Sequence, residues 1–361
     1  MGEEQQTIKQ SFFKRKDIEI SAKRYLQDAL SAMALGLFAT LLMGTILAVL
    51  GEQTANLFGD NAISAFLVEV GGIAKQGMIM GAGIGVAVAT GLKAPPLVIY
   101  SSVVTGAMGA TFMGFGIEYS GGPAGAFIAC ALGAEFGKMV SKETKVDILV
   151  TPAVTIVVGG IAAKLVGPAV GWCLMKIGAA IMAATVWQPF LFGIFIAVVV
   201  GLVLTAPISS AALCIMLDLS GLAAGAATVG CCAQMIGFAV ASYRENGVGG
   251  LVAQGIGTSM LQVSNIIKNP WILVPPTLAA AIIGPLATCV FHMTNIPVGA
   301  GMGTCGLVGQ IGTFTSMGFT LDVLWKVILL HIVLPAVLAF AIDRIMRKIG
   351  LIKDGDYKLD L

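Results

Sequence analysis

A row of neutral polar side chains lies within one of the most apolar parts of the sequence. The segment TSMLQVSNIIKNP, at 258–270, contains the amides Gln262, Asn265 and Asn269. An amide or hydroxyl surrounded by hydrocarbon is costly unless it is hydrogen-bonded, so such groups either join helices or contact a ligand. Several neutral donors and acceptors in one segment suit a ligand with hydroxyls and no net charge. We predict that these three amides bind a small polar, sugar-like solute.

Another pair of amides lies in a sequence motif that occurs twice. The segments VGGIAKQG at 70–77 and VGGLVAQG at 248–255 both end in Gln-Gly, and each leads further along the chain into Lys-x-Pro. Many transporters are built from internal repeats, and their substrate sites lie where broken helices of two copies meet. We predict repeat elements near 70–97 and 248–274, with Gln76 and Gln254 as further solute ligands. The alternative for both amides is that they join helices.

Two hydroxyls follow a proline in the segment TAPISSAAL, at 205–213. The surrounding stretch, 207–241, is apolar but interrupted by proline, Asp218 and several glycines, so it forms either two crossings or a short re-entrant hairpin followed by one crossing. Non-helical backbone at membrane depth is tolerated only where protein covers it or where it lines a cavity. The interruption therefore indicates a binding site, and Ser209 and Ser210 join the predicted solute ligands.

The elements that position these groups must lie in a membrane. Of the 361 residues, 57% are hydrophobic and only 11% are charged, whereas a soluble domain carries roughly 25% charged residues. Apolar stretches approach the roughly 20 residues that a helix needs to cross a bilayer; they lie at 29–50, 148–163, 189–204, 273–290 and 323–342. We predict an all-α polytopic membrane protein with about ten transmembrane helices and re-entrant or broken segments.

Basic residues border this apolar body. We divide the chain into a basic amphipathic N-terminus at 1–28, a single transmembrane domain at 29–345 and a tail at 346–361. Because Lys and Arg accumulate on the cytoplasmic side, we expect both termini, and the loop with Lys138, Lys142 and Lys145, in the cytoplasm. The segment 172–188 carries Trp near both ends, which is typical of a helix lying at the membrane interface. The net charge of +2 does not indicate nucleic-acid binding.

Sequence patterns for catalysis or cofactor binding are missing. The chain lacks the metalloprotease, nucleophile-elbow and phosphate-loop motifs. Its seven cysteines lie in apolar or glycine-rich surroundings without ligand spacing. We therefore expect no cofactor, no metal and no enzymatic activity of its own. The two histidines, His292 and His331, either bond to a neighbouring helix or take part in proton or substrate binding.

Much of the chain resembles a known family. The segments GGPAGAFIACALGAEFGKMVSK, VDILVTPAVTIVVGGIAAKLVGPAVG and TAPISSAALCIML are similar, in order and spacing, to the membrane-embedded IIC component of the bacterial phosphotransferase system, fructose-like branch. The resemblance extends over residues 70–310. It implies a homodimeric carrier in the bacterial inner membrane that works by alternating access. It also implies that separate IIA and IIB proteins perform any phosphoryl transfer and dock at cytoplasmic loops, with Lys138–Lys145 as the expected surface.

Some positions depart from the family pattern. Ser209 and Ser210 lie where the family has an Asn-Lys pair, Met260 where sugar-transporting members have a Glu, and Val298 where they have a His. These departures are similar to those of a divergent IIC-like subgroup that includes the perfringolysin-regulator-like membrane proteins. Two hypotheses follow: transport of a small polar solute, or sensing of a metabolite or lipid without phosphorylation-coupled transport. Lipid binding in a cavity that has become apolar is a third.

Overall fold

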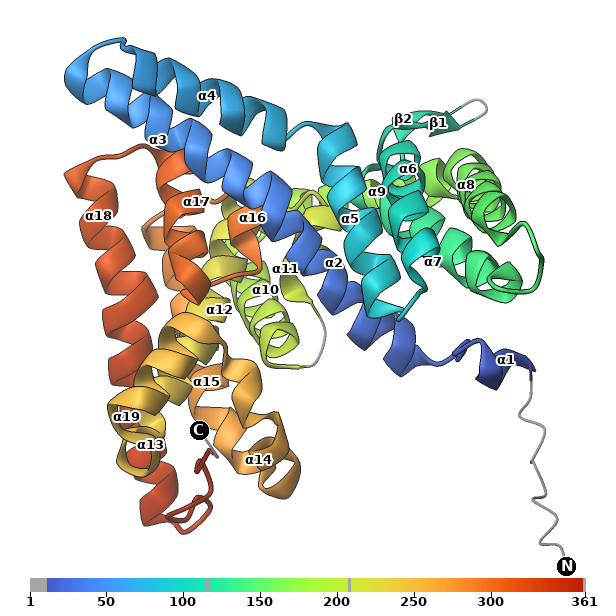
Figure 1. Cartoon of the computed structure of the whole chain (residues 1–361). Coiled ribbons are helices and arrows are strands. Elements are labelled where there is room, and N and C mark those ends of the chain that lie inside the picture. Colours follow the sequence, from blue (N-terminus) through green and yellow to red (C-terminus); the bar gives the residue numbers. More distant parts are fainter. Residues whose placement is uncertain (1–11, 115–116, 207–208, 360–361) are drawn as a thin grey trace, which may run out of the picture. The chain divides into compact units, whose positions relative to one another are not determined.

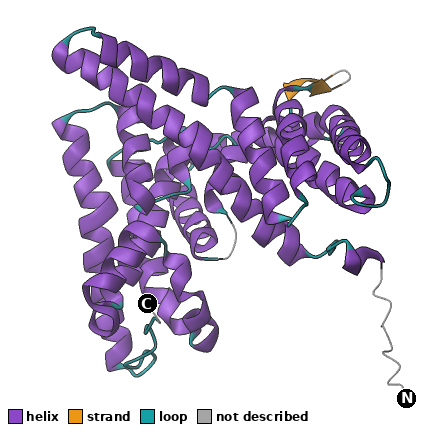
Figure 2. Cartoon of the chain, in the orientation of Figure 1, coloured by secondary structure: helices purple, strands orange, loops and turns teal. Residues whose placement is uncertain are grey.

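The protein is almost entirely helical, as predicted (Figures 1 and 2). The computed structural model describes residues 12–114, 117–206 and 209–359. Within these ranges the strands are β1 (Met113–Gly114) and β2 (Ile117–Ser120), which pair as a short antiparallel hairpin. The described chain forms two compact units. Unit 1 comprises the described residues of Met1–Thr40 together with Lys75–Gly171, and unit 2 comprises Leu41–Ala74 and the described residues of Trp172–Leu361.

Unit 1 is a bundle of closely packed helices. In it α5 packs against α2 and α6, α6 packs against α7, and α8 packs against both α6 and α7. Small residues allow this approach, because a Cβ atom added at Gly85 of α5 would meet the carbonyl of Ser102 in α6. The elements are α1 (Phe12–Arg15), η1 (Lys23–Ala29), α2 (Leu30–Leu37), α5 (Gly77–Gly91), α6 (Pro96–Thr111), α7 (Gly122–Val140) and α8 (Asp147–Leu165).

Unit 2 is organised around α12, the most buried candidate membrane span. Helices α10, α15 and α19 pack against α12, and α3 pairs with α4. The elements, with η for π- and 3-10 helices, are α3 (Met43–Phe58), α4 (Ala62–Ala74), α10 (Pro189–Thr205), α11 (Ser210–Met216), α12 (Gly221–Ala241), α13 (Tyr243–Val252), η3 (Ala253–Gly257), η4 (Ser259–Gln262), α14 (Val263–Lys268), η5 (Pro270–Leu273), α15 (Val274–Pro285), η6 (Leu286–Val290), α16 (Pro297–Ala300), η7 (Cys305–Leu307), α17 (Val308–Met317), α18 (Leu321–Val327), η8 (Ile328–Val333) and α19 (Leu334–Lys348). Two further helices, η2 (Phe38–Leu42) and α9 (Gly167–Trp187), each contain a boundary of the units.

Among the described residues, six helical runs are long and apolar enough to cross a membrane. The consecutive helices α4 and α5 provide a seventh if they form one broken span. These helices confirm a multi-pass membrane protein, but the expected number of about ten crossings stays a prediction. The apolar stretch at 189–204 corresponds to α10, which has only 17 residues, and α6 has only 16. Helix α7 has 19 residues but carries Glu135, Lys138 and many glycines.

Three local expectations met different outcomes. Residues 172–187 belong to α9, which begins at Gly167 and is long and apolar enough to cross a membrane, so the expected placement at the interface stays a prediction. In the stretch 207–241, α11 has seven residues and rises about 10 Å, which is too short to cross a membrane; the structure thus favours a re-entrant hairpin followed by α12. Pro207 lies outside the described residues. The repeat is not confirmed, because the first copy continues as one helix, α5, whereas the second breaks into η3, η4 and α14.

Candidate functional site

Two interrupted segments of unit 2 meet beside α12. The first is α11 with the loop that leads to Gly221, and the second runs from 291 to 308 through α16 and a tight turn. Gly221 and Asn295 form an antiparallel bridge, with N···O distances of 3.1 and 3.2 Å. The hydroxyl of Ser210 donates to the carbonyl of Gly301 at 2.6 Å. The broken backbone thereby finds partners inside the protein, as a membrane interior requires.

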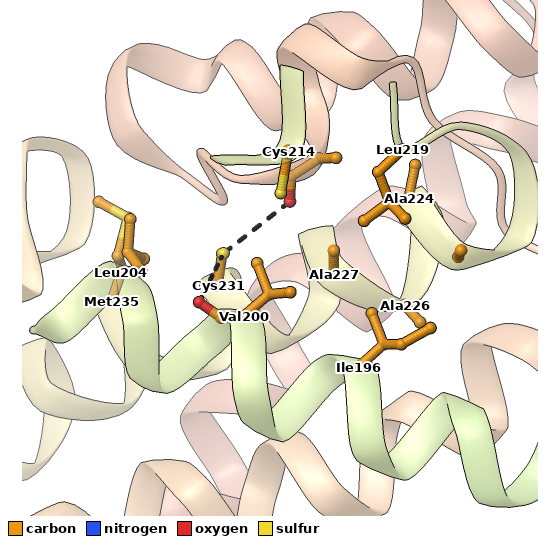
Figure 3. Close-up of a cluster of buried hydrophobic side chains, with 12 residues drawn as sticks. Ile196, Val200, Leu204, Cys214, Leu219, Ala224, Ala226, Ala227, Cys231 and Met235 are labelled. Atoms are coloured by element: carbon orange, nitrogen blue, oxygen red, sulfur yellow. Dashed lines mark hydrogen bonds between the residues drawn. The ribbon is translucent and has the colours of Figure 1, made fainter. Parts of the chain in front are cut away.

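Small side chains allow the interrupted segments to reach α12. A Cβ atom at Gly225 would meet the carbonyl of Met293. In Figure 3, Cys231 of α12 lies among apolar side chains, with its sulfur 3.8 Å from the carbonyl of Val200 and 3.9 Å from that of Ala300. This dense packing positions the polar groups of the second segment against α12.

Asn295 stabilises the extended part of the second segment. It is almost fully buried, and its amide nitrogen donates to the hydroxyls of Thr228 at 2.7 Å and Thr313 at 3.2 Å and to the carbonyl of Gly309 at 2.9 Å. Its side-chain oxygen accepts from the backbone N–H of Ile296. Both the nitrogen and the oxygen of this amide are therefore occupied. Through them Asn295 joins α12 to α17 and holds the extended backbone at 295–296 in place.

Gln310 is buried but only partly hydrogen-bonded. Its Nε2 lies 3.1 Å from Nδ1 of His331 and 3.5 Å from the sulfur of Cys232. Its Oε1 has no partner in the described part of the chain, although the residue is only 7% exposed. Exchanging the amide oxygen and nitrogen would leave the nitrogen unpaired instead. A buried unpaired polar group costs about 1–3 kcal/mol, so this atom is suited to a hydrogen bond with a ligand or water.

The surroundings of Gln310 are polar but uncharged. His331 lies in η8, and π-helical turns of this kind occur frequently at functional sites. Among the described residues, the side chains that hydrogen-bond to Gln310 and Asn295 are hydroxyls, the thiol of Cys232 and the imidazole of His331. Such groups donate and accept hydrogen bonds without attracting an ion. The arrangement therefore suits a neutral, hydroxylated ligand.

Sequence reasoning identified part of this site. Ser209 accepts from the backbone N–H of Ala212 at 3.1 Å and so caps α11, while Ser210 joins the two interrupted segments. Sequence reasoning also named His331, but it missed Asn295 and Gln310. The signal for Gln310 was a lone amide in the glycine-rich stretch that leads into an apolar span.

Four other predicted ligands come together at a different place in unit 2. Gln262 donates to Oε1 of Gln254 at 2.9 Å and to the carbonyl of Tyr357 at 3.0 Å, and it accepts from Asn265 at 2.8 Å. Asn265 also donates to the carbonyl of Lys358 at 2.9 Å. Together with Asn269 these residues form what we term the amide ladder: Gln254, Gln262, Asn265 and Asn269. In this structure the ladder joins 254–269 to the C-terminal tail.

Asn269 and Gln254 form the ends of the ladder. Asn269 donates to the carbonyl of Leu351 at 3.1 Å and to Oδ2 of Asp356 at 2.7 Å. Gln254 donates to the hydroxyl of Ser242 at 2.7 Å, which links the ladder to the end of α12. The remaining predicted ligand, Gln76, belongs to unit 1, where it is exposed and precedes α5.

The tail itself is built into unit 2. Tyr357 is fully buried, and its hydroxyl donates to Asp343 at 3.0 Å. Arg347 pairs with Asp343 at 2.8 Å and with Glu245 at 2.9 Å, and its guanidinium lies over the Tyr357 ring. Burial, reinforced by Asp343, raises the pKa of Tyr357 well above its usual value. The expected cytoplasmic tail is therefore an ordered part of the fold over its described residues.

A hollow of about 390 Å³ lies between α10 and α14. Apart from Thr205 its lining is apolar, with Leu202, Val263 and Ile267 among the side chains. The hydroxyl of Thr205 is 2.9 Å from that of Ser259 and is thus already occupied. This lining suits a hydrocarbon chain better than a hydroxylated solute.

Comparison with known proteins identifies the family. No curated protein and no solved structure matches the chain. The family model described as "Phosphotransferase system, EIIC" matches residues 27–359, which include every group described above. The match is to the family as a whole and does not extend to the fructose-like branch or to the perfringolysin-regulator-like subgroup. A helical, multi-pass protein with interrupted segments in the membrane is what such a component requires, and the chain belongs to the phosphotransferase system EIIC family.

Proposed function

We propose that this protein carries a small, neutral, hydroxyl-rich solute, such as a sugar, and that the solute binds beside Gln310 and His331. Membership of the EIIC family makes the protein a membrane transport component that works with IIA and IIB proteins. The nature of the solute is inferred from the chemistry of the site. The observation that carries the proposal is the buried side-chain oxygen of Gln310, for which the described residues provide no partner.

The surroundings of that atom support a solute of this class. Ser210 and Asn295 belong to the two interrupted segments, and both side chains are neutral. A transporter binds its solute where broken helices meet, because backbone and side-chain groups there can exchange partners. Movement of these segments relative to α12 would provide alternating access. The amide ladder could contact the solute only after the tail leaves it, since its N–H groups are occupied.

The proposal also includes the orientation of the protein in the membrane and its protein partners. The basic residues at both ends and at Lys138–Lys145 favour cytoplasmic termini in a bacterial inner membrane. The IIA and IIB proteins would then dock at the cytoplasmic loops, including that of Lys142. By resemblance to the family, we propose that the protein works as a homodimer.

Transport assays test this proposal. The purified protein is reconstituted into liposomes, and uptake of labelled sugars and sugar alcohols is measured with and without IIA and IIB. We expect Gln310→Leu to raise the KM for uptake about tenfold, because one hydrogen bond to the solute is lost. Thr315→Val is the control, since that exposed hydroxyl bonds only to its own helix. Absence of uptake for every solute, or a wild-type KM in Gln310→Leu, would overturn the proposal.

A sensing function is a second candidate, and the docked tail favours it. The tail is held by side chains of 246–269, so a rearrangement of that region would release it on the side where soluble partners bind. A sensor would change transcription in response to a metabolite or lipid without net transport. Comparing a deletion strain with the wild type distinguishes the two functions: altered transcription with unchanged solute uptake supports sensing, and the converse supports transport.

A further inference from the structure

A pocket of about 450 Å³ lies within unit 1 and involves none of the residues proposed to bind the solute. Its volume is typical of small-molecule sites. Four chain segments contribute to it: the end of α1 with the two residues after it, the α5–α6 turn, the end of α7 and the loop before α8. The lining contains five cations, which are Arg15, Lys16, Lys93, Lys138 and Lys142. Against them are two carboxylates, those of Asp17 and Glu143.

Part of the positive charge at the rim is left without a carboxylate. Arg15 and Lys16 both pair with Glu143, so one carboxylate serves two cations. The hydrogen bond from Lys16 lowers the pKa of Glu143 and keeps it ionised. Lys93 and Lys142 are exposed and, within the described ranges, have no carboxylate within ion-pair distance. Their ammonium groups are thus available to an anion.

The buried cation Lys138 lines the pocket, and a second buried cation, Arg24, shares two hydrogen-bond partners with it, the Asp17 and Leu92 carbonyls. Lys138 is only 1% exposed, pairs with Glu135 at 2.9 Å and donates to the carbonyl of Asp17 at 2.8 Å. Arg24, also buried, pairs with the Asp17 carboxylate at 2.7 Å, and both cations donate to the carbonyl of Leu92. Nε of Arg24 has no partner among the described residues. Because each of these two cations is paired with a carboxylate, they mainly fix the shape of the pocket, and the positive charge left for an anion lies on Lys93 and Lys142 at the rim.

We propose that this pocket binds a phosphate group, carried either by an anionic phospholipid or by a soluble phosphate ester. Arginine and lysine donors that converge from several segments match the oxygens of phosphate, and basic pockets between membrane helices hold lipid headgroups. The half-exposed ring of Phe12 lies beneath Arg15 and Lys16, at 5.6 and 5.9 Å from their charged groups. This apolar edge next to the cations favours a lipid as the source. The proposal does not depend on which solute is transported.

Binding measurements on the purified full-length protein test the proposal. The probes are phosphatidylglycerol, phosphatidylcholine, glycerol 3-phosphate and inorganic phosphate. The pocket variant, Lys93→Gln with Lys142→Gln, removes two exposed cations that form no ion pair with any described residue. The control variant, Lys75→Gln with Lys145→Gln, removes the same charge from exposed positions of unit 1 that do not line the pocket. Thermal unfolding of both variants verifies that each is folded.

We expect the pocket variant to bind the anionic probe about tenfold more weakly, and the control variant to bind as the wild type does. Weakening confined to phosphatidylglycerol identifies a lipid headgroup, and weakening that extends to glycerol 3-phosphate or inorganic phosphate identifies a soluble ester; both support the proposal. Equal affinities of the two variants, or no binding of any probe to the wild type, would overturn it. Poly-glutamate serves as an additional probe, and loss of poly-glutamate binding alone would instead identify a docking surface for an acidic protein.

Discussion

Replacing Gln262 by alanine should release the C-terminal tail from unit 2. The side chain is fully buried and makes three hydrogen bonds in the amide ladder, two as donor and one as acceptor. Two of its partners keep another bond after the substitution, because Tyr357 still accepts from Asn246 and Asn265 still donates to Lys358. Oε1 of Gln254 loses the only donor that the described residues provide.

These lost hydrogen bonds determine how much the docking of the tail should weaken. Each lost hydrogen bond costs about 1 kcal/mol, and leaving a buried oxygen unpaired costs about 1–3 kcal/mol. We therefore expect docking of the tail to weaken by about 3 kcal/mol, which is roughly a hundredfold shift in its equilibrium. Hydrogen exchange measures this shift directly, because the N–H of Leu359 donates to Asn246 only while the tail is docked.

A matched substitution provides the control for this experiment. Gln76→Ala removes the same side chain at an exposed position in unit 1, so it should leave exchange in the tail unchanged. The structural role of the ladder would be refuted if Gln262→Ala left exchange of 351–359 unchanged but raised the KM for solute uptake. That result would support a direct contact between the amide and the solute.

Three further predictions follow from local geometry. Above pH 10, where an exposed tyrosine ionises, the protection of the tail amides relative to their intrinsic base-catalysed exchange should fall in the wild type, since the raised pKa of Tyr357 makes docking favour its neutral form; Tyr357→Phe should remove this loss of protection. Gly225→Ala should lower the stability of the protein by about 1–3 kcal/mol in thermal unfolding, because the added Cβ meets a backbone carbonyl, whereas Gly249→Ala adds one in open space. Ser209→Ala should cost about 1 kcal/mol in the same assay through loss of the helix cap, and an unchanged midpoint would contradict that role.

Composition and local sequence pattern were sufficient to predict the class of the protein. The deficit of charge and the long apolar runs predict a helical membrane protein, because a helix satisfies its backbone hydrogen bonds within one segment and needs roughly 20 apolar residues to cross a bilayer. The interruption around Ser209 and Ser210 allowed either two crossings or a short re-entrant hairpin, and the seven residues of α11 favour the hairpin. Such features depend on neighbours in the chain, so the order of residue types is enough to reveal them.

The roles of the individual amides depended on contacts between distant segments. The sequence shows that Gln262 and Asn265 need hydrogen-bond partners, but it does not show that carbonyls of the tail, at Tyr357 and Lys358, provide them. In the same way Gln310 differs from the satisfied amides only through what packs around it. The sequence by itself thus determined which groups must be paired in the membrane, whereas only the tertiary structure decided which of them keep an atom free for a ligand.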